Sequence, residues 1–275
     1  MQVVFYDINH VPIIFLFFKI GLLTDIITFT PEMKKHTIYQ EIVAAKSANK
    51  KLLAILLDPD KIICETVSEL ILKINQSPAT HVFIGGSHVG TTILDDLIVR
   101  IKEDCTLPIV LFPGHPSQIS KYADGILFLT LLSGRNPDYL IEHQVNAAPI
   151  LKQTQLEIIS TGYILIESGT TTAVERVSNT KPIGRNNLDL VLATALAGEM
   201  LGNKLIYLEA GSGAQQAVPQ EMIAAVAQNS SIPLIVGGGI IDTQGIQNAY
   251  DSGADLVVIG TAFENDMNFF NQYYK

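Results

Sequence analysis

Three glycine-rich stretches in the last third of this sequence could bind an anion. They are YLEAGSG at 207–213, GGG at 237–239 and GT at 260–261, and each adjoins a short apolar run. Glycine has no Cβ, so backbone N–H groups can come close to a phosphate, and the helix starts that follow add favourable dipoles. Three such turns in register predict a phosphate pocket. The alternative is that they are only tight turns between strands and helices.

A second group of polar residues follows two apolar runs in the first third of the chain. Asp58 comes directly after the run 52–57, and Ser87 follows a pair of glycines. A carboxylate and a hydroxyl are hard oxygen ligands, and Mg²⁺ takes one or two of these while water and a substrate's phosphate fill its other positions. Asp58 and Ser87 are therefore the predicted Mg²⁺ ligands. A turn or helix cap is the alternative role for Asp58.

Glu209 is the candidate general base, because it ends an apolar run beside the predicted phosphate pocket. Burial there can raise the pKa of a carboxylate toward the working pH. A structural ion pair is the alternative. Lys61 and Arg185 are candidate contacts for a diphosphate, with ordinary surface charge as their alternative. The long polar stretch 168–187 contains Arg185 and predicts a lid over the site.

These residues need a scaffold that gathers them, and the chain from residue 51 onward predicts one. Short apolar runs alternate with helical patterns, which is typical of βαβ units and a parallel sheet. The eight predicted strands are 52–57, 81–84, 109–112, 125–129, 163–166, 205–208, 234–236 and 256–259. Eight units favour a closed (β/α)8 barrel, or TIM barrel, in which the active site lies at the C-terminal ends of the strands.

Helical patterns follow most of these strands, with one exception. The predicted helices are 37–48, 66–75, 93–101, 137–147, 188–201, 220–228, 243–251 and 263–274. The connection 113–124 contains Pro113, Gly114 and Pro116 and is too short and too broken for a full helix. The third outer helix is therefore predicted to be missing or vestigial. The apolar strand surface left open there would suit a long apolar substrate or an oligomer interface.

Composition narrows the class of protein. With 275 residues, of which 48% are hydrophobic and 16% charged, residues 33–275 can form a single barrel domain. The net charge of −9 argues against nucleic-acid binding. Only two cysteines occur, Cys64 and Cys105, so neither a disulfide framework nor a zinc site is indicated, and a cytoplasmic location is expected.

Residues 1–32 stand apart from the barrel pattern as an N-terminal extension. The apolar run 11–29 is interrupted by Lys19 and Asp25 and has no basic stretch before it, which fits a signal peptide or a membrane span poorly. Two alternatives stay open. The run is an anchoring helix, or Met33 is the native start and residues 1–32 are not part of the native protein.

Several motifs together resemble the geranylgeranylglyceryl phosphate synthase family, which includes the bacterial heptaprenylglyceryl phosphate synthases. They are LDPDK at 57–61, GGS at 85–87, YLEAGSG at 207–213, GGGI at 237–240 and GT at 260–261. Their order and spacing agree with the family from about Ile38 to the C-terminus. HPSQIS at 115–120, LLSGRNP at 131–137 and KPIGRNN at 181–187 resemble the second, longer group of that family.

The resemblance implies a Mg²⁺-dependent prenyltransferase. Such an enzyme joins the C3 hydroxyl of sn-glycerol 1-phosphate to geranylgeranyl diphosphate or a related polyprenyl diphosphate, forming an ether and releasing diphosphate. Asp58 and Ser87 match the magnesium positions, and Glu209 matches the carboxylate near the attacking hydroxyl. The positions that match the glycerol-phosphate site are Tyr207, Leu208, Glu209, Ala210, Gly211, Ser212, Gly213, Gly238, Gly239, Gly260 and Thr261.

One departure affects the diphosphate contact. Many members of the first group have Lys where this chain has Leu56, so Lys61 or Arg185 is expected to supply the charge. The resemblance also implies a homo-oligomer, dimer or hexamer, and transient contact with a membrane surface for the lipid product. Two other functions stay open: another phosphate-binding barrel enzyme, such as a sugar-phosphate isomerase or a thiamine-phosphate-type synthase, and a non-catalytic phosphate sensor.

Overall fold

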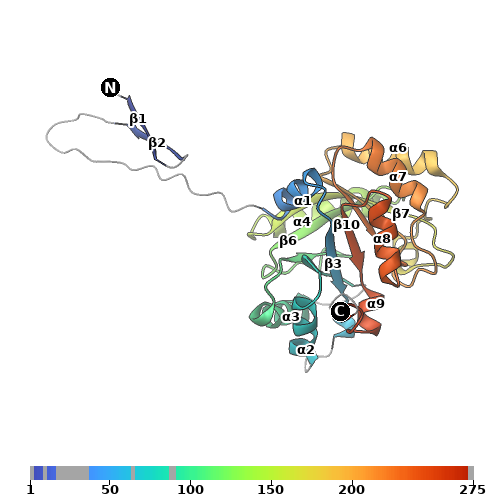
Figure 1. Ribbon diagram of the computed structural model, residues 1–275. Coiled ribbons are helices and arrows are strands. Elements are labelled where there is room, and N and C mark those ends of the chain that lie inside the picture. The colour runs from blue at the N-terminus through green and yellow to red at the C-terminus, as the bar shows by residue number, and fades with distance from the viewer. Residues whose placement is uncertain (1–2, 9–10, 17–36, 63–65, 87–90, 272–275) are drawn as a thin grey trace. The chain divides into compact units, whose positions relative to one another are not determined.

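The computed structural model describes residues 3–8, 11–16, 37–62, 66–86 and 91–271 (Figure 1). The chain divides into two compact units, Met1–His36 and Thr37–Lys275. In the first unit β1 (Val3–Ile8) pairs antiparallel with β2 (Val11–Leu16). Strand β2 contains residues 11–16 of the apolar run 11–29, and the other residues of that run lie outside the described part of the chain. None of the described helices is both long and apolar enough to cross a membrane.

The second unit is a closed barrel of parallel strands in the order β10-β3-β4-β5-β6-β7-β8-β9. The predicted (β/α)8 class is confirmed. Figure 1 shows β3 and β10, which come from opposite ends of this unit's sequence, lying side by side where the barrel closes. The strands are β3 (Leu52–Leu57), β4 (His81–Ile84), β5 (Ile109–Leu111), β6 (Gly125–Leu131), β7 (Glu157–Leu165), β8 (Leu205–Glu209), β9 (Leu234–Gly237) and β10 (Leu256–Ile259).

Helices cover the outside of the barrel, apart from one gap. They are α2 (Val67–Asn75), α3 (Thr91–Asp104), α4 (His143–Leu151), α5 (Ala173–Ser178), α6 (Leu188–Met200), α7 (Gln220–Asn229), α8 (Thr243–Asp251) and α9 (Thr261–Asn265), with short turns η1 (Pro59–Lys61) and η3 (Asp138–Glu142). Residues 112–124, between β5 and β6, contain no helix. The missing third outer helix is therefore confirmed, and the prolines that predicted it lie in this connection.

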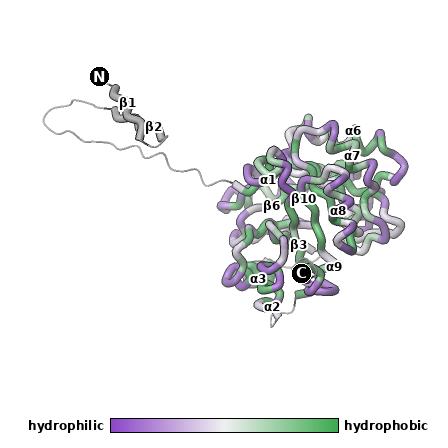
Figure 2. Tube along the Cα trace, in the orientation of Figure 1, coloured by the Kyte–Doolittle hydropathy of each residue, from purple (hydrophilic) through white to green (hydrophobic). Residues whose placement is uncertain are grey.

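The core has two layers, one inside the barrel and one between the strands and the outer helices. Figure 2 shows hydrophobic residues concentrated along β3, β6 and β10. Neighbouring strand residues point to opposite faces, so Leu52 and Ala54 face the interior while Leu53 and Ile55 pack under the helices. Truncating one such buried Leu or Ile to Ala costs about 2–5 kcal/mol. This double burial explains why the strand sequences show little polar alternation.

Helix α1 (Ile38–Ser47) packs against the interior layer at the amino-terminal end of the barrel. A capping box begins it, in which Thr37 and Gln40 exchange hydrogen bonds between side chain and backbone. Glu157, at the start of β7, accepts the N–H groups of Ile38 and Tyr39 at 2.6 and 3.1 Å. Four interactions therefore satisfy the first turn of α1 and dock it to the sheet.

Two predicted boundaries differ from the structure by six residues or more. β7 begins at Glu157, six residues before the predicted start at 163, because Ser160 and Thr161 interrupt the apolar run that marks the strand. Thr161 is nonetheless fully buried, with its hydroxyl bonded to the carbonyl of Ile159. The last helix ends at Asn265 instead of 274. The Asp266 carboxylate accepts the N–H of Asn268 at 2.9 Å, a local bond that competes with helix continuation.

Candidate active site

The parallel barrel brings the predicted site residues to one rim. Asp58 follows β3 directly, and β3 pairs with both β10 and β4. Gly260, just after β10, lies beside Leu56, because a Cβ built on this glycine would be 3.5 Å from the Leu56 carbonyl oxygen. Gly86, just after β4, lies under the Asp58 carboxylate, at 2.3 Å by the same measure. The acidic group and the glycine turns thus share the C-terminal rim.

Two glycines after β9 have no space for a side chain. Gly238 has φ +79°, and a Cβ there would lie 2.3 Å from Oε1 of Glu209. Gly239 has φ +69°, and a Cβ there would lie 2.7 Å from the backbone N of Ala217. Both positive φ and close contact require glycine. The turn after β9 is therefore packed directly on the turn after β8, as a phosphate cup built from backbone requires.

Glu209 ends β8 at the base of this cup and is only 5% exposed. Its Oε1 accepts the N–H of Gly211 at 2.6 Å. Burial raises the pKa of Glu209 from 4.5 to about 6, although the Tyr207 hydroxyl and the Gly211 N–H favour the charged form. At pH 7 this carboxylate is ionised and holds a pKa close to the working range, as a general base needs.

Tyr207 lies beside Glu209, and its hydroxyl interacts with that carboxylate. The side chain is fully buried, and the hydroxyl makes no hydrogen bond of good geometry within the described residues. A Cβ on Gly237 would lie 2.5 Å from the Tyr207 hydroxyl and 2.9 Å from Glu209 Oε2, so both groups lie over this glycine. Burial and the charge of Glu209 raise the pKa of Tyr207 well above 10. A buried hydroxyl that forms no well-aligned hydrogen bond can accept one from, or donate one to, a polar ligand.

Partly buried apolar side chains line the barrel interior beside the cup. Phe112, at the end of β5, stacks on Tyr207 with ring centroids 5.4 Å apart and contacts Tyr163 at 5.9 Å. Phe112, Leu56 and Leu129 are only partly buried and pack against the barrel interior. Polar and apolar surfaces therefore meet at Tyr207, beside the candidate base.

Asp58 has the chemistry and the exposure of a metal ligand. Its side chain is 22% exposed. It also caps η1, since Oδ1 accepts the N–H of Asp60 at 3.2 Å, so the alternative role as a cap is real as well. A carboxylate has about four acceptor positions, and one cap bond leaves room for Mg²⁺. Ser87 lies outside the described residues. Among those described, no three His, Cys, Asp or Glu side chains cluster to hold a metal, and Mg²⁺ needs only one or two carboxylates.

Glu264, on α9, is a rim residue that the sequence pattern did not reveal. Its Oε1 accepts the backbone N–H of Asp58 at 3.1 Å, and its Oε2 accepts the ammonium of Lys61 at 2.7 Å. Burial opposes the charge of Lys61, but the hydrogen bond and charge of Glu264, with the charge of Asp58, raise its pKa above 10.5. Lys61 therefore lies beside Asp58 on the rim as a firmly protonated cation.

Gln118 is a second residue whose position only the structure reveals, although it lies in the HPSQIS stretch. It is 4% exposed. Its amide donates to the carbonyl of Gly86 at 2.7 Å and accepts the N–H of Gly114 at 2.7 Å. These two bonds join the end of β4 to the connection that replaces the third helix, and so hold the backbone that leads into Ser87.

The predicted lid segment packs on the loop after β8. The carbonyl of Ser168 accepts the N–H groups of Gln215 and Gln216, each at 3.2 Å. Arg185 donates to the carbonyls of Glu167 at 3.0 Å and Ala217 at 2.8 Å. Arg185 therefore ties the segment to the loop, and its contact with a diphosphate, like that of Lys61, stays a prediction.

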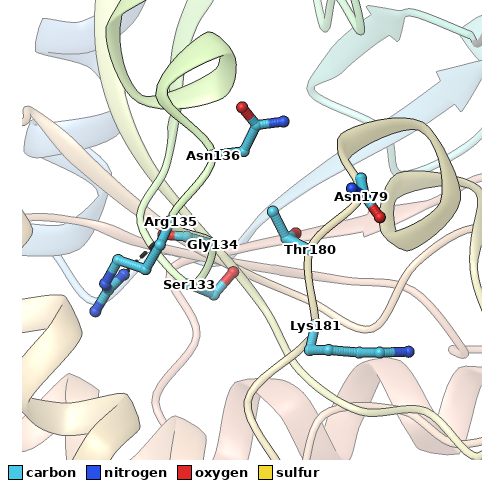
Figure 3. A pocket seen from close by; sticks show the side chains of 7 residues that line it. All are labelled: Ser133, Gly134, Arg135, Asn136, Asn179, Thr180 and Lys181. Carbon is cyan, nitrogen blue, oxygen red and sulfur yellow. Dashed lines mark hydrogen bonds between the residues drawn. The ribbon is translucent and has the colours of Figure 1, made fainter.

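A pocket of about 560 Å³ lies outside this site, between the loop after β6 and the residues after α5 (Figure 3). Two stretches that carried the family resemblance meet here, since the pocket is lined by Ser133, Gly134, Arg135, Asn136, Asn179, Thr180 and Lys181. Figure 3 shows the Arg135 and Lys181 side chains pointing apart. Arg135 donates to two backbone carbonyls and Lys181 pairs with Glu175 at 2.7 Å, so these cations do not converge on an anion.

Known proteins resemble this chain over nearly all of the barrel. The PcrB family matches residues 46–275. Geranylgeranylglyceryl phosphate synthase of Flavobacterium johnsoniae is 68% identical over 235 residues, which are 86% of this chain and 97% of that protein. The Zunongwangia profunda protein of the same name is 51% identical over 228 residues, 83% of this chain and 97% of that protein.

Solved structures agree with these matches. (S)-3-O-geranylgeranylglyceryl phosphate synthase from Thermoplasma acidophilum, in complex with its substrate sn-glycerol-1-phosphate, has a TM-score of 0.81 and 31% identity, covering 86% of this chain and 95% of its own. The tryptophan synthase α-subunit of Pyrococcus furiosus has a TM-score of 0.51 at 12% identity, over 82% of this chain and 94% of its own. The latter likeness concerns the fold alone.

Proposed function

This chain belongs to the PcrB family, and we propose that it joins sn-glycerol 1-phosphate to geranylgeranyl diphosphate or a related polyprenyl diphosphate. The product is an ether lipid precursor, and diphosphate is released. The observation that carries the proposal is Glu209, a buried carboxylate with a pKa near 6 at the base of the glycine cup. This chain is 68% identical to a geranylgeranylglyceryl phosphate synthase over 97% of that protein. The alternative function, another phosphate-binding barrel enzyme, is therefore not favoured.

The glycine turns are the proposed site for the phosphate of sn-glycerol 1-phosphate. The backbone after β8, β9 and β10 forms the cup, in which Gly238 and Gly239 leave no side chain between the turns. A phosphate held there places the glycerol part toward Glu209 and the Tyr207 hydroxyl. The Tyr207 hydroxyl would gain a well-aligned hydrogen bond when the ligand binds, which favours binding.

Glu209 is the proposed general base. The C3 oxygen of the glycerol attacks C1 of the prenyl group, so that a C–O bond forms while the bond from C1 to the diphosphate oxygen breaks. The diphosphate leaves with the electron pair, and the hydroxyl proton moves to Glu209. A pKa near 6 lets Glu209 accept this proton at neutral pH and release it to solvent afterwards.

Asp58 is the proposed Mg²⁺ ligand, with Ser87 as the second. The half-buried Asp58 carboxylate faces Gly86, where no side chain blocks access, and keeps acceptor positions free beyond its cap bond. Mg²⁺ bound there would supply positive charge to the departing diphosphate. Lys61, within 3.6 Å of Asp58, adds a second cation on the same side.

The prenyl chain is proposed to lie along the apolar surface of Phe112, Leu56 and Leu129. These side chains are partly exposed and pack against the barrel interior, and Phe112 begins the connection 112–124 that stands in place of the outer helix. Binding of a hydrocarbon chain here would be stabilised by about 25 cal/mol for each Å² of apolar surface removed from water. A sugar-phosphate isomerase would instead need polar side chains around the whole opening at the C-terminal rim of the barrel. A homo-oligomeric assembly, contact with a membrane surface and a cytoplasmic location stay predictions.

The decisive experiment is product analysis. Purified protein is incubated with sn-glycerol 1-phosphate, Mg²⁺ and prenyl diphosphates of graded length, and the lipid is identified by mass. A prenyl ether of glycerol phosphate that is absent with sn-glycerol 3-phosphate is the expected result. Asp58→Asn should weaken the Mg²⁺ dependence. Absence of any ether with every prenyl diphosphate would overturn the function, and an unchanged magnesium titration would remove Asp58 from the metal site.

A further inference from the structure

One lysine lies between two carboxylates at the rim, and it is closer to the one that is not a predicted metal ligand. The Lys61 ammonium is 2.7 Å from Oε2 of Glu264 but 3.6 Å from Oδ2 of Asp58. Only the first distance is a hydrogen bond. The lysine side chain is 49% exposed, while those of Asp58 and Glu264 are 22% and 16% exposed.

This placement matters because an ammonium and a metal ion compete for the same carboxylate oxygen. A lysine three residues after Asp58 can reach its carboxylate directly, and with no other partner it would pair there. Such a pair would have to break before a cation could bind. Glu264 offers Lys61 a stronger contact, so Asp58 keeps an oxygen available.

We propose that Glu264 is a positioning residue that holds Lys61 away from Asp58, so that the carboxylate is free for Mg²⁺ and the lysine faces the diphosphate. This rests on the proposed function, because it takes Asp58 as the metal ligand. Lys61 has three N–H donors and uses one on Glu264. The remaining donors can reach a phosphate oxygen without breaking the contact to Glu264.

Glu264 is itself held rigidly enough for this role. Its neighbour Phe263 is fully buried, and the Glu264 N–H donates to the Gly260 carbonyl at 3.0 Å. Its Oε1 is fixed by the Asp58 N–H, which leaves Oε2 directed at Lys61. One side chain thus joins the strand that carries the metal ligand to the turn that carries Gly260 and Thr261, and it sets the place of the cation between them.

The test is a double-mutant cycle on Mg²⁺ affinity. Glu264→Gln keeps an amide oxygen for the Asp58 N–H but loses the charge that attracts Lys61. Titration calorimetry of Mg²⁺ is run without diphosphate on wild type, Glu264→Gln, Lys61→Met and the double variant, so that loss of a lysine contact to diphosphate does not enter, and with inorganic diphosphate on wild type alone. Glu264→Gln should weaken Mg²⁺ binding about fivefold, and Lys61→Met should reverse that loss in the Glu264→Gln background while changing wild type less than about twofold.

Asp124 supplies a matched control at the other end of the barrel. Its carboxylate makes the same two contacts, with a lysine ammonium, Lys102, at 2.7 Å and a backbone N–H, that of Ile109, at 2.9 Å. Asp124→Asn should leave Mg²⁺ affinity unchanged. Thermal midpoints of all variants separate loss of folding from loss of metal binding.

Two results would count against the inference, and a third against its premise. If Lys61→Met tightens Mg²⁺ binding by the same factor in both backgrounds, Glu264 acts only through its charge at a distance. If Glu264→Gln lowers the thermal midpoint but leaves Mg²⁺ affinity unchanged, its role is structural. Failure of the wild type to bind Mg²⁺ with diphosphate would instead refute the metal site of the proposed function.

Discussion

Carboxylates lie at both ends of the barrel, and their partners differ. At the amino-terminal end, Asp255 accepts the N–H of Leu234 at 2.9 Å and the ammonium of Lys46 at 3.0 Å. Asp124 and Glu157 likewise have two partners each. At the carboxyl-terminal rim Glu264 also has two partners, but Glu209, which is more deeply buried than Asp255, accepts one well-formed hydrogen bond among the described residues, from the N–H of Gly211. The amino-terminal carboxylates thus serve stability, and Glu209 keeps acceptor positions for a ligand.

Two glycines, one at each end of the barrel, differ in what surrounds them. Gly202, in the turn before β8, has φ +93° and no heavy atom within 4 Å of an added Cβ. Gly238, after β9, has a similar φ but lies against Glu209 and the backbone of two other residues. Conformation alone therefore demands glycine at Gly202, whereas conformation and close packing both demand it at Gly238.

Removal of the Glu209 carboxylate should have the largest effect. Glu209→Ala should lower kcat by about 10²–10⁴-fold, the usual contribution of a general base. Because Glu209 is buried with few partners, the thermal midpoint should change little. Steady-state kinetics at saturating sn-glycerol 1-phosphate measure the first effect. Near-normal turnover of this variant would show that the rim carboxylate is not the base.

Substitutions of Gly238 and Gly202 should give the second largest difference in activity. Gly238→Ala forces Glu209 and the cup turn apart, and should lower kcat/KM roughly 100-fold, as a misplacement of about 1 Å can. Gly202→Ala adds only backbone strain, about 1 kcal/mol, and should leave activity unchanged. Kinetics and urea denaturation are measured on both. Equal losses of activity would contradict a difference between the two ends.

The smallest effect concerns pH, where the two ends should respond separately. Burial lowers the pKa of His81, at the start of β4, from 6.5 to about 4. The unfolded chain binds this proton more readily, so the stability from neutral His81 is present above pH 6.5 and lost as pH falls toward 4. Between pH 7 and 5 this amounts to about 2 kcal/mol.

His81→Phe should remove this loss of stability, whereas His115→Phe, at an exposed histidine, should not. Urea denaturation at pH 7 and pH 5 measures the difference. Turnover should fall separately, below about pH 6, as Glu209 becomes protonated. If His81→Phe leaves the acid sensitivity of folding unchanged, the buried histidine is not its source.

Much of the fold was predictable because the signals are local. Apolar runs such as 52–57 and 256–259 coincide with β3 and β10, since a strand buried on both faces needs an unbroken apolar sequence. The same reasoning gave the wrong start for β7, because the polar residues Ser160 and Thr161 interrupt its apolar run. The end of α9 was missed as well, because an aspartate turn overrides the helical pattern.

The candidate site divides in the same way. Asp58, Glu209 and the glycine turns were found from the sequence because each directly follows an apolar run, and parallel strands bring such positions to one rim. Glu264 lies inside helix α9 and does not directly follow a strand, so this sequence pattern does not point to it. Its partner Asp58 is 206 residues away, and they meet only because β10 pairs with β3 when the barrel closes.

The sequence by itself therefore determined the strand order of the repeat, the missing helix and the residue types offered to the ligand, since these depend on short-range pattern and backbone chemistry. Only the tertiary structure decided which of two carboxylates holds Lys61, how deeply Glu209 is buried and which hydroxyl lies buried beside it. Those properties depend on distances and solvent exclusion between segments remote in the chain, and no local pattern encodes them.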